Sequence, residues 1–165
     1  LTMLRLLLYW LTDRLPARII NGDDGSPYLE RYYVGTFFGL RAYIHRFVAS
    51  DPDRGTHSHP WQRSLSLVLV GGYKEIRING ERRLRPGQIN YIRGDDFHRV
   101  ILETNTEAWT LFIHGKRVKG WGFLRNGVYT PAAVTKNDNK FNNWHLTAQR
   151  GRVVRASINQ ITNQE

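Results

Sequence analysis

Short apolar segments separated by turn residues fill the stretch from 28 to 134, and this alternation most constrains the fold. The segments are rich in aromatic and β-branched residues, which favour strands. Asn79-Gly80 joins two of them and is a strong hairpin signal, and Arg125-Asn126-Gly127 predicts another hairpin. We expect strands at 32–34, 40–48, 65–70, 74–78, 81–84, 88–92, 99–103, 108–113, 121–124 and 128–134.

Almost no helical periodicity interrupts these segments, so the pattern predicts an antiparallel sandwich or barrel. A chain of 165 residues suits one domain. We therefore expect a single domain over 1–165, with a core at about 28–134 and a C-terminal extension at about 135–165.

The two ends of the chain differ from this core. Residues 4–19 carry apolar positions at helical spacing and predict a short N-terminal helix that Pro16 ends. Its apolar part is too short to span a membrane and lacks the small-residue cleavage site of a signal peptide. Residues 139–150 predict a second short helix around Phe141, Trp144 and Leu146. The tail from Arg152 is expected to be weakly ordered or dependent on an oligomer.

The composition excludes some chemistry and favours one class of partner. The chain has no cysteine, which excludes disulfides and thiolate sites and fits a cytoplasmic location. The formal net charge is +10, almost all from arginine, which favours anionic partners. The alternative is that the arginines only solvate the surface. We find no nucleic-acid-binding motif and no membrane segment.

Histidines supply the main functional prediction. On an extended strand, alternate side chains project to the same face, so His57 and His59 can bind one metal ion. His98, at the start of a later strand, is the third candidate ligand. Three imidazoles would leave coordination positions open for water or a small-molecule substrate.

These histidines and the turns around them resemble the two motifs of the cupin superfamily, over roughly residues 40–115. The matching positions of the first motif are Gly55, His57, His59 and Gly71-Gly72, and those of the second are Pro86-Gly87, the strand at 89–92, Gly94-Asp95-Asp96 and His98. The resemblance implies an all-β fold, a cupin-type antiparallel β-barrel (double-stranded β-helix or jelly roll), and a homodimer. The sequence His57 to Trp61 further resembles a set of small bacterial and phage cupins.

One position departs from the cupin pattern. The glutamate of the first motif is replaced by Arg63 and Ser64, and Gln62 is the nearest residue with a side-chain oxygen. The site then resembles the three-histidine set of thiol dioxygenases. Three neutral ligands leave the full charge on the metal, which favours an anionic or chelating substrate. The leading hypothesis is a mononuclear non-haem dioxygenase that uses Fe²⁺; Zn²⁺, Mn²⁺ and Ni²⁺ also accept imidazole.

Other residues are candidates for supporting roles. Tyr91 and His45 are the candidate catalytic proton carriers. Strand alternation places His45 on the face of Arg41, Tyr43 and Phe47, and places His114 on the face of Thr110 and Phe112. Each histidine is either a fourth ligand, a group that supports a ligand, or a structural histidine.

The remaining candidates are simpler. Trp61 is expected to form a wall of the site, and Arg99 either contacts substrate or faces outward. Asp95 and Asp96 are expected to make a turn, and His145 to take no part.

Three further functions stay open at this stage. The protein could bind a small ligand without catalysis, with the metal as its anchor. It could be a metal-dependent isomerase or epimerase of a sugar or nucleotide. It could also bind nucleic acid through its arginines. The sequence leaves it uncertain whether the chain is an enzyme.

Overall fold

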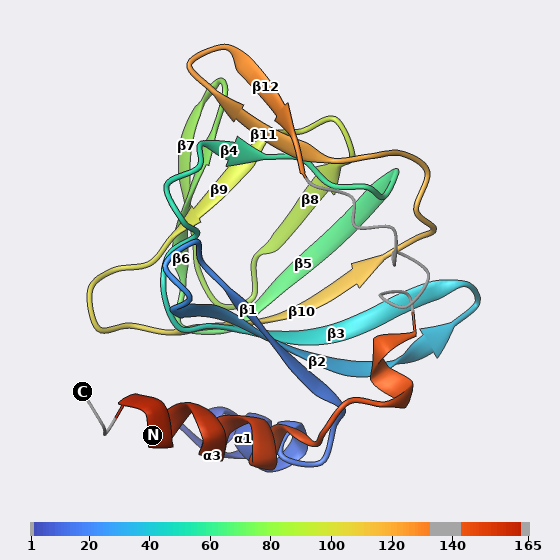
Figure 1. Cartoon of the computed structure of the whole chain (residues 1–165), viewed down its shortest axis with the longest axis vertical. Coiled ribbons are helices and arrows are strands. Elements are labelled where there is room, and N and C mark those ends of the chain that lie inside the picture. The colour runs from blue at the N-terminus through green and yellow to red at the C-terminus, as the bar shows by residue number, and fades with distance from the viewer. Residues whose placement is uncertain (1, 133–142, 163–165) are drawn as a thin grey trace.

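The structure, a computed structural model, describes residues 2–132 and 143–162, whose strands form two antiparallel sheets (Figure 1). The strands of the first sheet are, in spatial order, β1 (Ala17–Asn21), β2 (Pro27–Phe37), β3 (Leu40–Phe47), β10 (Ala108–His114), β5 (Arg63–Val70) and β8 (Ile89–Arg93). Those of the second are β12 (Val128–Pro131), β11 (Gly122–Arg125), β4 (Thr56–His57), β9 (His98–Ile101), β6 (Tyr73–Arg77) and β7 (Gly80–Leu84).

The two sheets face each other as a jelly-roll sandwich, which confirms the predicted all-β class (Figure 1). Within the described residues no ladder joins the first sheet to the second, so the sheets do not close into one continuous barrel. The consecutive strands of the chain cross between the sheets several times, so residues distant in sequence meet on facing walls.

The predicted hairpins are present where the turn residues place them. Asn126 and Gly127 both have positive φ, 50° and 77°, as a type I′ turn between β11 and β12 requires. The Asn79-Gly80 hairpin joins β6 and β7. Gly71 ends β5 with φ 75°, and a Cβ there would lie 2.1 Å from the Glu107 carbonyl oxygen. This glycine is therefore required by a strand-end turn.

Side-chain alternation on the first sheet also follows the prediction. On β3, Arg41, Tyr43, His45 and Phe47 line the space between the sheets. Ile44, on the opposite face, packs with the apolar residues beneath the sheet. A strand's inward face could thus be assigned from its sequence because each side chain alternates.

One apolar cluster joins the two sheets and forms the floor of the space between them. Its buried members are Leu29, Phe47, Val68, Tyr73, Leu84, Val100 and Ala108. They come from strands of both sheets, and burying them supplies the main cohesion of the sandwich.

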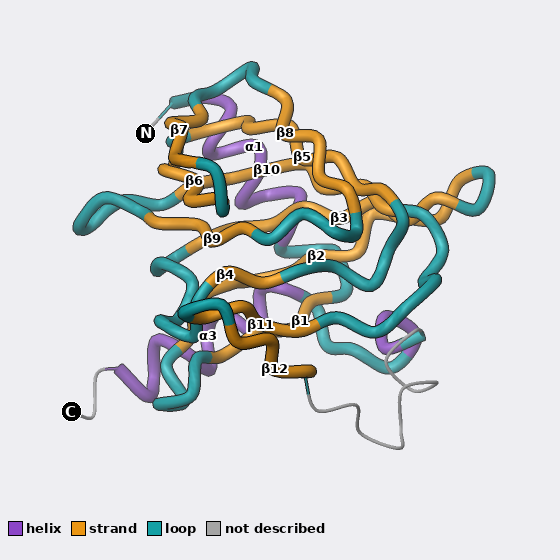
Figure 2. Tube along the Cα trace, turned by 90° about the horizontal axis from the view of Figure 1, so that it is seen from above, coloured by secondary structure: helices purple, strands orange, loops and turns teal. Residues whose placement is uncertain are grey.

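Two helices cover the outer face of the first sheet, α1 (Met3–Thr12) and α3 (Gly151–Thr162) (Figure 2). The apolar cluster between this face and the helices contains Leu8, Ala17, Tyr32, Ile44, Val70 and Trp109. Among the described residues no helix has the length and apolar character to cross a bilayer.

The predicted helix at 4–19 is too long. The helix ends at Thr12, and Ala17–Asn21 forms strand β1, which pairs with β2. Pro16 lacks the amide hydrogen that would continue the helix. The following residues alternate between the two faces of the sheet, and tertiary pairing outweighs the weak local helical pattern. The extended strand assumed for His57 and His59 is shorter than expected, since β4 covers only Thr56–His57 and His59 lies in the loop that follows.

The tail from Arg152, expected to be weakly ordered or dependent on an oligomer, is helical over most of its length. Residues 151–162 form α3, and Arg155 fixes this helix to the body: its guanidinium donates to Thr12 Oγ1, to the Tyr32 hydroxyl and to Asp13. These partners could not be predicted from the residues near Arg155 because they lie at the other end of the chain. Of the helix expected at 139–150, only a short 3₁₀ turn at Trp144–Leu146 lies within the described residues, and 133–134 of the last predicted strand lie outside them.

We expect Arg155→Ala to lower the free energy of unfolding by about 2–4 kcal/mol, because it leaves Asp13 and the tyrosine hydroxyl beneath the helix without their donor. Arg152→Ala, on the exposed side of the same helix, is the control and should change it by less than about 0.5 kcal/mol. Urea unfolding followed by circular dichroism measures both. Equal effects of the two variants would show that α3 is not anchored through Arg155.

Candidate metal centre

The second sheet brings the three predicted ligands together. His57 on β4 is the direct cross-strand partner of His98 on β9, and His59 follows in the loop after β4. The ring centroids form a nearly equilateral triangle, with sides of 4.6 Å (His57–His98), 5.0 Å (His59–His98) and 5.1 Å (His57–His59). One ligand nitrogen from each ring lies within 4.8 Å of the others. We call these residues the three-histidine cluster.

The nitrogen positions fit a shared cation. The Nε2 atoms of His59 and His98 lie 2.8 Å apart and face each other. Two imidazole lone pairs at this distance need a proton or a cation between them. Two nitrogens bound to one metal at about 2.1 Å would lie about 3 Å apart in octahedral geometry. The cluster can therefore hold one metal ion with little movement.

Glu75 fixes the orientation of His98. Its Oε1 lies 2.8 Å from His98 Nδ1, so the proton of the neutral ring is on Nδ1 and the Nε2 lone pair is directed toward the cluster. Burial alone would raise the pKa of Glu75, but hydrogen bonds from His98 and Arg77 outweigh it and hold the pKa well below its ordinary value. The carboxylate therefore stays charged beside His98.

Asp51 plays a weaker part beside His57. Its Oδ2 lies 3.6 Å from His57 Nδ1 and accepts a 2.8 Å hydrogen bond from the Val100 amide. Burial raises the pKa of Asp51, while the bond from Val100 opposes that rise. The contact favours a proton on Nδ1 of His57, as Glu75 does for His98.

Burial favours the neutral form of two of the ligands, His57 and His59. Burial lowers the pKa of His57 and of His59 well below 6.5, and the neighbouring rings of the cluster lower each further. A metal ligand must present an unprotonated nitrogen. Neutral rings are therefore the form that the protein favours here.

The cluster lies on one wall of a cavity of about 610 Å³ between the sheets. Trp61 forms part of the wall, as expected, and stacks on His114 with ring centroids 3.8 Å apart. Phe112 lies between the two walls, 4.8 Å from the His45 ring and 6.2 Å from the His59 ring. This volume accommodates a small organic molecule beside the cluster.

Comparison with solved structures identifies the fold. A sugar phosphate isomerase of the cupin superfamily from Silicibacter pomeroyi matches 75% of this chain and 92% of its own, with a TM-score of 0.52 and 15% identity. The chain has a cupin fold. The DMSP lyase DddQ from Ruegeria pomeroyi matches 66% of this chain and 60% of its own (TM-score 0.52, 18% identity).

A structure of the DMSP lyases RdDddP and RnDddQII is similar as well, covering 67% of this chain and 63% of that one, with a TM-score of 0.54 and 17% identity. No protein-family model and no curated protein matches the sequence. At these identities the likeness shows the fold alone.

The structure does not bring Tyr91 to the cavity. Its neighbours Asn90 and Ile92 on β8 are buried, so alternation puts Tyr91 on the outer face, where it is 43% exposed. The catalytic role expected of Tyr91 is therefore corrected. Arg99 also faces outward and pairs with Asp53 at 2.7 Å. Gln62 is exposed and does not line the cavity.

The other histidines divide as follows. His45 is buried on the cavity wall opposite the cluster, and its Nε2 accepts a 2.9 Å hydrogen bond from Arg31 Nε. His114 also lines the cavity and donates from Nδ1 to the Gly115 carbonyl at 2.7 Å. His145 stacks on Tyr33, outside the cavity. Asp96 makes the predicted turn by accepting from the Arg93 amide.

Sequence reasoning missed Glu75 and Arg31. Glu75 lies within the predicted strand at 74–78, and the Asn79-Gly80 hairpin places it opposite Arg82, with its side chain inward. An acidic residue at an inward position of an interior strand was the available signal. Arg31 lies at an inward position of β2 by the same alternation.

We expect Glu75→Gln to weaken Zn²⁺ binding by about 10- to 100-fold, because the neutral amide no longer holds the His98 ring as an anion does. Glu81→Gln, on the adjacent strand β7 and paired only with Lys74, is the control. Competition with a chromophoric chelator measures both affinities. Unchanged affinity in Glu75→Gln would remove the positioning role.

We expect His114 to make the protein sensitive to acid. Burial lowers its pKa from 6.5 to about 4, so between these values the unfolded chain takes up a proton that the folded chain does not. Stability is therefore complete above about pH 6.5 and falls as the pH drops toward 4, by up to about 1.4 kcal/mol per pH unit for this group. His114→Asn should reduce the pH slope of the unfolding free energy by about 1 kcal/mol per unit in EDTA-treated protein; an unchanged slope contradicts this assignment.

Proposed function

We propose that this cupin is a mononuclear non-haem metal enzyme that oxidises a small anionic substrate with dioxygen, with His57, His59 and His98 as ligands of Fe²⁺. The observation that carries the proposal is the convergence of three imidazoles on one wall of a cavity. Bound iron would supply coordination positions for substrate and dioxygen and would relay electrons from the substrate to dioxygen.

The charge of the cavity supports an anionic substrate. Among the described residues, the cavity lining includes one carboxylate, Asp51, and five guanidinium groups, those of Arg18, Arg31, Arg41, Arg54 and Arg117. Three neutral histidines add no negative charge that would offset the metal. An anion entering this cavity meets more positive than negative charge among the described lining residues.

The chain's own residues have separate roles in this proposal. The three-histidine cluster binds the metal, and Glu75 holds His98 in its binding orientation. Trp61 and Phe112 give the cavity apolar walls that exclude water from the reacting end of the substrate.

A second candidate is a metal-dependent isomerase of a sugar phosphate. The similarity to a sugar phosphate isomerase and the arginine-rich cavity favour it. This reaction consumes no dioxygen and needs a group that moves a proton, for which the cavity offers His45 and His114.

The decisive measurement is metal content together with oxygen consumption. We expect the purified protein to bind about one Fe²⁺ after anaerobic reconstitution, and His57→Ala and His98→Ala to lose it. His145→Ala, outside the cavity, is the control. Oxygen uptake is then measured with a panel of small carboxylates, thiols and sugar phosphates.

Two results would contradict the dioxygenase. Retention of metal without oxygen uptake, but with interconversion of a sugar phosphate, would select the isomerase. Retention of metal with every compound recovered unchanged would leave a ligand-binding cupin.

A further inference from the structure

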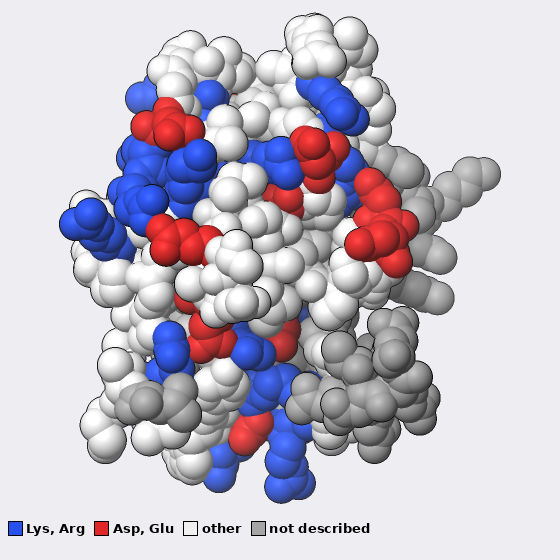
Figure 3. All heavy atoms as spheres, turned by 90° about the vertical axis from the view of Figure 1, so that its left-hand side faces the viewer, with Lys and Arg blue, Asp and Glu red and all other residues white. Residues whose placement is uncertain are grey.

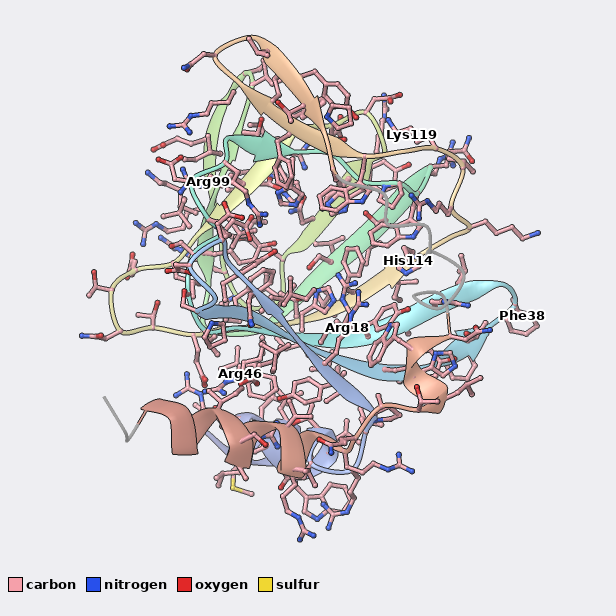
Figure 4. The ribbon with its side chains drawn as sticks, in the orientation of Figure 1. Arg18, Phe38, Arg46, Arg99, His114 and Lys119 are labelled. Atoms are coloured by element: carbon pink, nitrogen blue, oxygen red, sulfur yellow. The ribbon has the colours of Figure 1, made fainter. Side chains whose placement is uncertain are left out.

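Arginines on the first sheet form a second feature of the cavity, facing the three-histidine cluster. Arg18 on β1 and Arg31 on β2 are direct cross-strand partners, and Arg31 is in turn the partner of His45 on β3. All three side chains line the cavity. Figure 4 shows Arg18 on the side of the sheet that faces the cavity, whereas Arg46 lies on the side of the helices.

Arg31 is charged but has no carboxylate partner among the described residues. Its one hydrogen bond there is from Nε to His45 Nε2, at 2.9 Å, and its guanidinium also lies 5.4 Å from the centroid of the Tyr43 ring. The two terminal amino groups therefore have no acceptor in the described part of the chain. A guanidinium presents a planar pair of donors that matches the two oxygens of a carboxylate or phosphate.

The surface arginines are arranged differently. On the face that Figure 3 shows, basic side chains lie among acidic ones. Arg77, Arg83 and Arg99 each form an ion pair with a nearby carboxylate. Arg31 has no such partner among the described residues, whereas Arg54, which also lines the cavity, pairs with Asp23.

Like charges on directly paired residues of a sheet repel each other. Burial, and to a smaller degree the charge of Arg18, lowers the pKa of Arg31 to about 10. An oxyanion beside both would remove this repulsion. His45 contributes by accepting from Nε, which holds the Arg31 fork with its amino groups available to the cavity.

We propose that Arg31, with Arg18 beside it and His45 holding its orientation, binds a carboxylate or phosphate group at one end of the substrate, whose other end reaches the three-histidine cluster. The Phe112 ring is close to both subsites, with its centroid 4.8 Å from that of His45 and 6.2 Å from that of His59. The substrate class is therefore a short molecule with two polar ends. This inference rests on the proposed function. It adds to the metal a second point at which the protein binds the substrate.

The test titrates inorganic phosphate and, separately, acetate into the reconstituted protein by calorimetry at constant ionic strength. We expect Arg31→Met to bind the preferred anion at least about 10-fold more weakly than wild type, and Arg18→Met to be weakened in the same direction. Arg63→Met removes one positive charge from an exposed position of β5 and should bind as wild type does. Circular dichroism checks that each variant is folded, and either arginine variant alone tests the subsite.

His98→Ala separates this inference from the proposed function. We expect it to lose the metal and to keep anion binding. Anion binding that disappears in His98→Ala and persists in Arg31→Met would show that the metal, and not the arginines, binds the anion, and would overturn the subsite. Absence of phosphate and acetate binding to wild type would overturn it as well. A protein without metal whose anion binding depends on Arg31 would instead contradict the enzyme and keep the subsite.

Discussion

The pairing of β4 with β9 is the constraint on which the site depends. It sets His57 directly opposite His98, and the extended backbone after His57 returns His59 to the same side. A shift of one residue in this pairing would turn either ring to the other face of the sheet. Because β4 contains only two residues, its register is also held by β11, where His57 lies opposite Phe123.

The second requirement is a fixed ring orientation, which a buried carboxylate supplies. Glu75 is completely buried and accepts from His98, Arg77, Arg82 and Asn90. A buried charge is tolerated only when it is so fully hydrogen-bonded. Several polar side chains inside the sandwich thus surround the one carboxylate that orients His98. Burying so many polar groups around one imidazole would cost stability without benefit if that ring had no function.

The sequence predicted the strands, the main hairpins and the three candidate ligands because each depends on local pattern: alternation, turn residues and a two-residue histidine spacing. It failed where partners come from the far end of the chain. Nothing near Arg155 indicates Tyr32 or Asp13, so α3 was not foreseen. The register of β1 with β2, which sets Arg18 beside Arg31, is likewise a tertiary property. Tyr91 was a candidate through its nearness to His98 in sequence, and strand parity removed it.

The two halves of the cavity belong to different layers. The histidines come from the second sheet, the arginines Arg18 and Arg31 from the first, and the apolar floor joins the layers only at one end. A molecule held at both walls would bridge the layers at the open end. Its binding free energy would then add to the interactions that hold the two sheets together. Binding of the molecule and the distance between the sheets would therefore depend on each other.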